Sequence, residues 1–199
     1  MSIIRFREPD TASIRDFLND RQFQPFSYPE TGYTQSGKRP AGYHIDRHRV
    51  QLGAGEAAFE RARKSLRDWR MFSLDWVRLC WPFKRIQPGV VVGIVTHQYW
   101  FWTLNAARIV YVIDEPRRFG FAYGTLLDHV ARGEEQFLVD WRDDDSVWYE
   151  ISSFSVARHW IGWAGYPLAR LLQRQFGRDS VRAMARAMVE DRAPIRIAG

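Results

Sequence analysis

Residues 168–188 read LARLLQRQFGRDSVRAMARAM, near the end of a chain of 199 residues. Apolar side chains recur there at intervals of three or four residues, which is the spacing of one face of an α-helix. The stretch therefore predicts a long amphipathic helix that begins near Arg158, ends near Glu190 and must bury one face against the rest of the chain. Pro167 predicts a bend near Tyr166, because proline lacks an amide donor and clashes with the preceding turn.

The segments that precede this helix have the composition of β-strands. β-branched and aromatic residues gather in short runs that are separated by Gly, Pro and Asp. We expect strands at residues 43–52, 76–81, 90–102, 108–114, 119–124, 134–141 and 147–154, and one short helix at 56–69. The run Asp143-Asp144-Asp145-Ser146 predicts a hairpin turn between the last two strands. Short links between the strands indicate antiparallel pairing.

This order of elements predicts an α+β fold of the helix-grip kind. A curved antiparallel sheet of about seven strands would wrap around the long C-terminal helix, because a sheet of that size curls and its concave face must be covered. Residues 41–190 would form this domain, and residues 191–199 would form a frayed tail. Residues 1–40 would form an irregular N-terminal extension packed on the domain, with a short helix capped by Asp10 or Thr11.

The chain has a single cysteine, Cys80, which excludes an intramolecular disulfide and a cysteine-rich metal site. A chain so poor in thiols is typical of a reducing compartment. The first 20 residues are too charged for a signal peptide. No apolar run reaches the roughly 18 residues that a membrane span needs. We therefore expect a cytoplasmic protein without a transmembrane segment.

Five short motifs resemble an uncharacterised family found in bacteria and plants. The motifs are Tyr28-Pro29-Glu30-x-Gly32, Gly42-Tyr43-His44-x-Asp46-x-x-Arg49-Val50-x-Leu52-Gly53, Arg67-x-Trp69-Arg70-Met71-Phe72, Ile109-Val110-Tyr111-Val112 and Phe119-Gly120-Phe121-Ala122-Tyr123-Gly124-Thr125-Leu126. The family is a domain of unknown function placed in the SRPBCC superfamily, with START domains and the pollen-allergen-like ligand carriers. The resemblance covers about Phe26 to Val189. It implies the helix-grip fold and, by analogy, a ligand-binding role, but no established activity.

Aromatic residues make up 15% of the chain, with nine Trp, which is typical of a roomy interior. On the predicted strand at 119–124 the bulky residues share one face, since Gly and Ala alternate with them. We therefore expect a protein that binds a small hydrophobic or aromatic ligand in a cavity between the sheet and the C-terminal helix. The candidate lining residues are His97, Tyr111, Phe119, Phe121, Tyr123, Phe137, Trp141, Tyr149, Leu168 and Leu172. A solid core beneath the helix is the alternative interpretation of the same residues.

No catalytic residue is assigned from the sequence. A cyclase- or hydrolase-like enzyme that uses the same cavity is the first alternative function. The ionisable residues that predicted strands offer to such an enzyme are His97, Tyr111, Glu135 and Glu150. Each of them can instead lie in solvent or pair with a structural partner. His44 and His48 would lie about 13 Å apart on one strand, so no metal site is expected, and no motif indicates a cofactor.

Five arginines recur every four residues along the predicted C-terminal helix, namely Arg170, Arg174, Arg178, Arg182 and Arg186. Residues 158–199 hold eight Arg against three acidic residues, which accounts for +5 of the net charge of +6. The series spirals over about 160° of the helix surface as a basic stripe. The second alternative is therefore an interaction module for anionic partners, with weak contact to an anionic membrane. A solvated helix face explains the same pattern. We expect no nucleic-acid binding, because no base-reading motif is present, and nothing specifies an oligomeric state.

Overall fold

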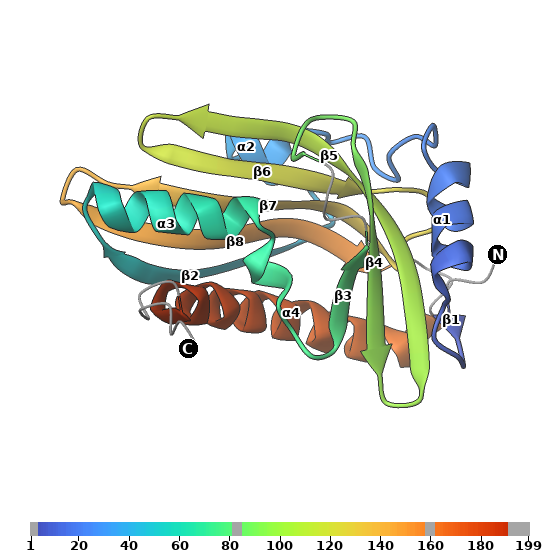
Figure 1. Cartoon of the computed structure of the whole chain (residues 1–199). Helices are drawn as coiled ribbons and strands as arrows, with labels where there is room; N and C mark the ends of the chain where they lie inside the picture. The colour runs from blue at the N-terminus through green and yellow to red at the C-terminus, as the bar shows by residue number, and fades with distance from the viewer. Residues whose placement is uncertain (1–3, 81–84, 158–161, 191–199) are drawn as a thin grey trace, which may run out of the picture.

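The computed structural model describes residues 4–80, 85–157 and 162–190. Figure 1 shows a sheet that curls over two helices, with a further helix on its outer surface. The elements in chain order are β1 (Ile4–Arg5), α1 (Thr11–Asp20), α2 (Tyr33–Ser36), β2 (His44–Ala54), α3 (Glu56–Arg67), the 3₁₀-helix η1 (Arg70–Phe72), β3 (Val77–Cys80), β4 (Val91–Gln98), β5 (Phe101–Glu115), β6 (Arg118–Thr125), β7 (Ala131–Trp141), β8 (Ser146–Ala157) and α4 (Gly162–Glu190). The predicted helix start near Arg158 and the tail at 191–199 lie outside the described residues.

The strands form one antiparallel sheet in the order β2-β8-β7-β6-β5-β4-β3, and β1 pairs with the start of β5. The strands β3 to β8 follow one another as neighbours. β2 lies at the opposite edge, beside β8, because α3 carries the chain across the concave face (Figure 1). The long helix α4 also lies against this face. The architecture confirms the predicted helix-grip fold.

The single strand predicted at residues 90–102 is wrong, because the chain turns back in its middle. β4 ends at Gln98 and β5 begins at Phe101, and these two residues pair across the turn. The turn consists of Tyr99 and Trp100, and neither is a residue type that turns favour. The high strand propensity of two aromatic residues therefore hid a hairpin.

One end of the concave face is a solid aromatic core. Strand alternation points Phe121, Phe137 and Tyr149 inward beneath α3, η1 and α4, and all three are fully buried. Trp69 packs edge-on against Phe121, with ring centroids 4.9 Å apart. Met184 of α4 is buried in the same core. This part of the sheet therefore offers no space for a ligand.

Polar contacts as well as apolar ones hold α4 on the sheet. The hydroxyls of Tyr149 and Ser180 lie 2.7 Å apart within the core. Nearer the start of the helix, Asp46 of β2 accepts two hydrogen bonds from the guanidinium of Arg170, at 2.6 and 3.0 Å. Such a bidentate pair fixes orientation as well as distance. Pro167 lies inside α4, and the bend it implies stays a prediction.

Gly177 lets α4 approach β2 closely. A Cβ atom here would lie 2.3 Å from Cδ2 of His48, so an alanine must displace the imidazole. We expect Gly177→Ala to lower the free energy of unfolding by about 1 to 2 kcal/mol, although alanine is the better helix former by about 1 kcal/mol. Urea denaturation measures this change. In the His48→Ala background the clash is absent, so Gly177→Ala should become stabilising. An equal loss in both backgrounds would contradict the steric explanation.

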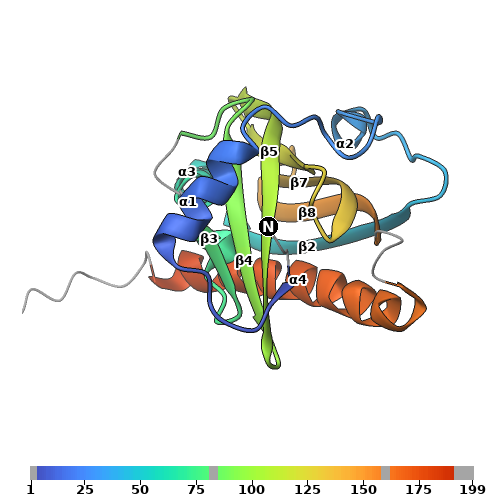
Figure 2. The ribbon, with the colours of Figure 1, turned by 90° about the vertical axis from the view of Figure 1, so that its right-hand side faces the viewer.

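The N-terminal segment covers the convex face of the sheet. Asp10 caps α1 as predicted, since its carboxylate accepts the amide N–H of Ser13 at 2.7 Å. The helix then packs its apolar residues Ile14, Phe17 and Leu18 against β4 and β5 (Figure 2). α1 therefore covers the convex face of these two strands.

Glu134 of β7 anchors the next part of this segment. Its buried carboxylate accepts hydrogen bonds from the Tyr28 hydroxyl at 2.8 Å and from the Gly32 amide at 2.7 Å. The amide of Thr34 donates to it at 3.1 Å, and the Thr34 hydroxyl donates as well. One side chain, which no sequence pattern singled out, thus holds residues 28–34 on the sheet.

Candidate functional site

A cavity of about 410 Å³ lies between the sheet and the N-terminal half of α4. Its roof comes from Leu168, Ala169, Leu172 and Phe176 of α4. Apolar side chains of η1, β3, β4 and β5 extend this lining, namely Phe72, Val77, Ile94 and Phe101. The cavity takes up the part of the concave face that the aromatic core leaves open.

Small side chains at inward-facing strand positions create this space. The lining residues of this kind are Thr96, Thr103, Asn105, Gly133, Ser153 and Ser155. Farther along the same strands, β7 carries Phe137 and β8 carries Tyr149 at inward positions. The change from large to small residues along β7 and β8 therefore turns a filled core into a cavity.

A carboxylic acid and a phenol form the polar centre of the cavity. The Tyr123 hydroxyl donates a hydrogen bond to the Glu135 carboxyl at 2.5 Å. Burial raises the pKa of Glu135 from its ordinary 4.5 to about 7, against the opposing effect of that hydrogen bond. Burial and the nearby Glu135 raise the pKa of Tyr123 well above 10.0. Near neutral pH Glu135 therefore exists in both protonation states, and it can donate or accept a hydrogen bond.

A second polar strip lies on the wall formed by β4 and β5. The hydroxyls of Thr96 and Thr103 are 2.7 Å apart, and the Asn105 amide donates to Thr103 at 2.8 Å. The Asn105 carbonyl accepts the backbone N–H of Val130 at 3.1 Å. These groups satisfy one another, so they line the cavity without an energetic penalty for burial. The cavity thus combines an apolar roof with hydrogen-bonding groups on two walls.

The cavity residues predicted from sequence divide into two groups on this face. Those that line the cavity are Tyr123, Leu168 and Leu172. Those that belong to the adjoining aromatic core are Phe119, Phe121, Phe137, Trp141 and Tyr149. The prediction therefore located the concave face, while the lining contains smaller and more polar residues than it named.

His97 and Tyr111, the remaining two candidates, lie on the opposite face of the sheet. His97 follows the inward-facing Thr96 on β4, and its ring stacks on Trp102 with centroids 4.1 Å apart. In β5 a register shift after Ile109 breaks the strand alternation, so Tyr111 points outward. Its hydroxyl lies 2.6 Å from that of Thr34. Neither side chain reaches the cavity.

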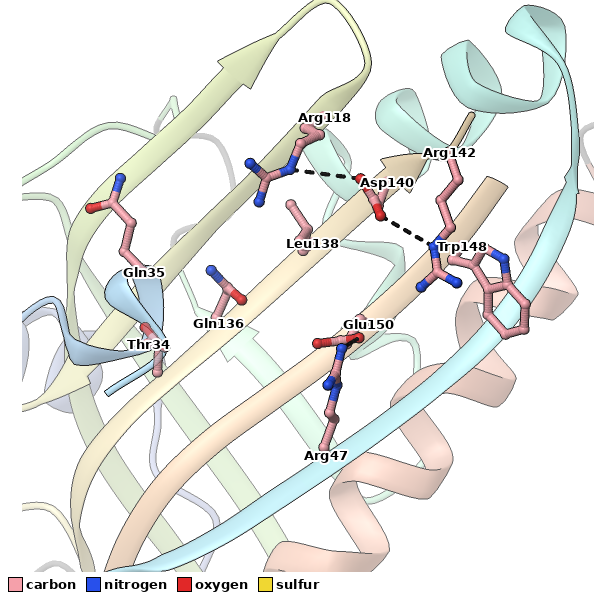
Figure 3. A pocket seen from close by; sticks show the side chains of 11 residues that line it. Thr34, Gln35, Arg47, Arg118, Gln136, Leu138, Asp140, Arg142, Trp148 and Glu150 are labelled. Atoms are coloured by element: carbon pink, nitrogen blue, oxygen red, sulfur yellow. Dashed lines mark hydrogen bonds and ion pairs between the residues drawn. The ribbon is translucent and has the colours of Figure 1, made fainter. Parts of the chain in front are cut away.

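A polar hollow of about 270 Å³ lies on the convex face, between α2 and the ends of β6, β7 and β8 (Figure 3). Arg118 and Arg142 both pair with Asp140, at 3.6 and 3.3 Å. Arg47 pairs with Glu150 at 2.5 Å, so this glutamate has a structural partner and lies away from the cavity. The charged groups of this hollow are engaged with one another, and we take the concave cavity as the candidate site.

The arginine stripe divides into one structural residue and four exposed ones. Arg170 is largely buried in its pair with Asp46. The exposed members are Arg174, Arg178, Arg182 and Arg186. Arg182 pairs with Asp179 on the same helix at 3.3 Å, a surface contact that contributes little to stability. The outward face of α4 therefore presents a row of cations.

Within residues 4–80, 85–157 and 162–190, no group of three or more His, Cys, Asp or Glu side chains is arranged to hold a metal ion. None of the helices in these same segments is long and apolar enough to cross a membrane.

Comparison with known proteins gives relatives of similar length. Residues 27–183 match the family described as "Domain of unknown function (DUF1990)". A "UPF0548 protein" of Dictyostelium discoideum is 36% identical over 204 residues, which covers 92% of this chain and 94% of that protein. A "UPF0548 protein" of Deinococcus radiodurans is 36% identical over 193 residues, 91% of this chain and 96% of that one.

Solved structures share the fold at low sequence identity. An aromatase/cyclase of Streptomyces superposes with a TM-score of 0.55 and 12% identity, over 76% of this chain and 97% of that one. The protein Ara h 8.0201 superposes with a TM-score of 0.51 and 12% identity, over 75% of this chain and 99% of that one. Human STARD10 superposes with a TM-score of 0.50 and 9% identity, over 92% of this chain and 81% of that one. At these identities the similarity shows the fold alone.

Proposed function

The chain belongs to the DUF1990 family, and on that premise we propose that it is a cytoplasmic binding protein for a small hydrophobic or aromatic molecule held between the sheet and α4. The cavity beneath α4, of about 410 Å³, carries this proposal. Ligand sites of small molecules have volumes of about 300 to 1,000 Å³ and a mostly apolar lining with few polar groups. The resemblance to START domains and pollen-allergen-like carriers supports it by analogy.

The lining suggests which ligand would fit. Leu168, Leu172 and Phe176 would contact an apolar body, and the Glu135–Tyr123 pair would hydrogen-bond to one polar group. A protonated Glu135 donates to a carbonyl or hydroxyl oxygen, whereas its ionised form would repel an anionic ligand. The ligand class is therefore a neutral molecule with an apolar body and one polar end.

Native mass spectrometry of protein purified without detergent tests this proposal. Ala169→Phe and Ser153→Phe fill the cavity from opposite walls, and Glu60→Phe adds the same ring on the exposed surface of α3. We expect wild type and Glu60→Phe to retain a bound molecule, or to be stabilised by neutral lipids or aromatic metabolites in a thermal-shift screen. Both cavity variants should lose this property. A wild type that retains nothing and is stabilised by nothing would contradict the proposal.

An enzyme that uses the same cavity is a second candidate. The observation in its favour is a carboxyl with a pKa of about 7 that faces the cavity beside a phenol, because such groups can transfer protons. Metabolite extracts incubated with wild type and with Glu135→Gln distinguish the two functions by mass spectrometry. Turnover by wild type that Glu135→Gln abolishes, with ligand retention unchanged, would favour the enzyme. No difference between the two would exclude Glu135 as an acid–base group.

A further inference from the structure

The tip of the β4–β5 hairpin exposes two large aromatic side chains. Tyr99 is 68% exposed and Trp100 is 73% exposed, and their ring centroids lie 5.9 Å apart. Phe6, just after β1, is 79% exposed, and β1 pairs with the stem of the same hairpin. Aromatic surface gathered in this way is typical of an interaction site.

The backbone of the turn is strained by the aromatic sequence. Tyr99 has a φ of 54°, in the left-handed region that bulky residues avoid. Glycine is the residue that adopts a positive φ at no steric cost, and it is common in two-residue hairpin turns for this reason. Glycine at position 99 would therefore make a more stable hairpin. Tyr99 and Trp100 therefore make the turn less stable than a glycine-containing turn would be. Strained residues that are also exposed point to a role in function and not in stability.

The hairpin tip and the basic face of α4 lie on one side of the molecule. Figures 1 and 2 differ by a turn about the vertical axis, and in both the hairpin extends below α4 while the sheet lies above it. The outward face of α4 therefore points to the same side as the tip. This face carries the exposed side chains of Arg174, Arg178 and Arg182.

We propose that this side of the molecule docks on an anionic lipid bilayer. Tyr99 and Trp100 would enter the headgroup region, where Tyr and Trp are enriched in membrane proteins. The α4 arginines would approach the lipid phosphates, and each cation near such a surface strengthens binding. A nucleic acid would use the same cations but would not require an aromatic tip on a turn. The combination therefore favours the bilayer.

The docking surface adjoins the cavity. Phe101, the first residue after the turn, lines the cavity together with Leu168 and Leu172 of α4 and Ile4 of β1. A molecule that leaves the bilayer at this surface would therefore enter beside the hairpin. This last step rests on the proposed ligand-binding function, whereas the docking itself does not.

Co-sedimentation with vesicles tests the docking. The probes are vesicles of equimolar phosphatidylcholine and phosphatidylserine, and vesicles of phosphatidylcholine alone. We expect wild type to bind the anionic vesicles and the double variant Tyr99→Gly/Trp100→Ser to bind them about tenfold or more weakly. The variant places glycine at the position of positive φ, so its melting temperature should equal or exceed that of wild type. Loss of binding then cannot result from unfolding. Phe23→Ser removes an aromatic ring that is 89% exposed elsewhere and should leave binding unchanged.

The charge contribution has its own matched pair of variants. Replacement of Arg174, Arg178 and Arg182 by Gln should weaken binding to the anionic vesicles on the order of 100-fold, at about fivefold for each arginine. A control triple, in which the exposed Arg15, Lys38 and Arg39 become Gln, should weaken it far less. The proposal would be overturned if wild type bound neither kind of vesicle, or if all the variants bound the anionic vesicles as tightly as wild type does. Retention of duplex DNA that the α4 triple abolishes, with vesicle binding unaffected, would also overturn it.

Discussion

Replacement of Glu134 by Ala is expected to lower the free energy of unfolding by about 3 to 4 kcal/mol. The buried carboxylate accepts hydrogen bonds from Tyr28, Gly32 and Thr34, which come from a segment about a hundred residues away in sequence. The substitution leaves the Tyr28 hydroxyl buried without its acceptor, and such an unsatisfied group costs about 1 to 3 kcal/mol. Urea denaturation followed by circular dichroism measures the loss.

Two further variants make this prediction specific. Glu115→Ala removes a carboxylate that is 53% exposed at the end of β5, and should change stability by less than about 0.5 kcal/mol. Glu134→Gln keeps the shape of the side chain but replaces one acceptor oxygen by an amide donor, which would face N–H and O–H donors. It should therefore lose most of what Glu134→Ala loses. A Glu134→Ala protein as stable as Glu115→Ala would show that the N-terminal segment does not depend on this anchor.

Glu135 is expected to make the protein less stable as the pH rises from about 4.5 to about 7. The folded protein keeps the proton up to a pKa of about 7, because burial disfavours the charged carboxylate, whereas the unfolded chain releases it near 4.5. Within this window the folded state binds more protons, so the free energy of unfolding falls as the pH increases. The total loss attributable to this group is on the order of 3 kcal/mol.

The variant Glu135→Gln isolates this effect from the other titrating groups. It retains an acceptor for the Tyr123 hydroxyl but cannot ionise. The difference in unfolding free energy between wild type and Glu135→Gln should therefore shift in favour of the variant between pH 4.5 and pH 7, and be constant below that range. Parallel pH profiles for the two proteins would mean that Glu135 has an ordinary pKa and lies in a well-solvated environment.

Most of the fold could be predicted from sequence because its elements have strong local patterns. The helical spacing of α3 and α4, the Asp-rich turn before β8 and the Asp10 cap are all determined by short stretches of sequence. The hairpin at Tyr99 and Trp100 is not predicted by the sequence, because neither residue is of a type that turns favour. The same unusual composition is what suggests a function for the tip.

The site was harder to predict because a cavity depends on small residues. Large aromatic residues on one strand face predicted the lining of a cavity, but Phe121 and Phe137 fill the space that they face. The cavity lies where Thr96, Ser153 and Ser155 occupy inward positions, and short polar residues on strands do not by themselves distinguish a lining from a solvated face. The register shift that turns Tyr111 outward is likewise decided by packing between strands.

Titration with N-phenyl-1-naphthylamine, a neutral aromatic probe that fluoresces in apolar surroundings, tests the central claim most directly. The claim is that α4 roofs a cavity open to small apolar molecules. Wild type and Glu60→Phe should bind the probe saturably, one molecule for each chain, and Ala169→Phe and Ser153→Phe should bind it at least about tenfold more weakly while they remain folded. Equal binding by all four proteins, or none by wild type, would contradict the claim.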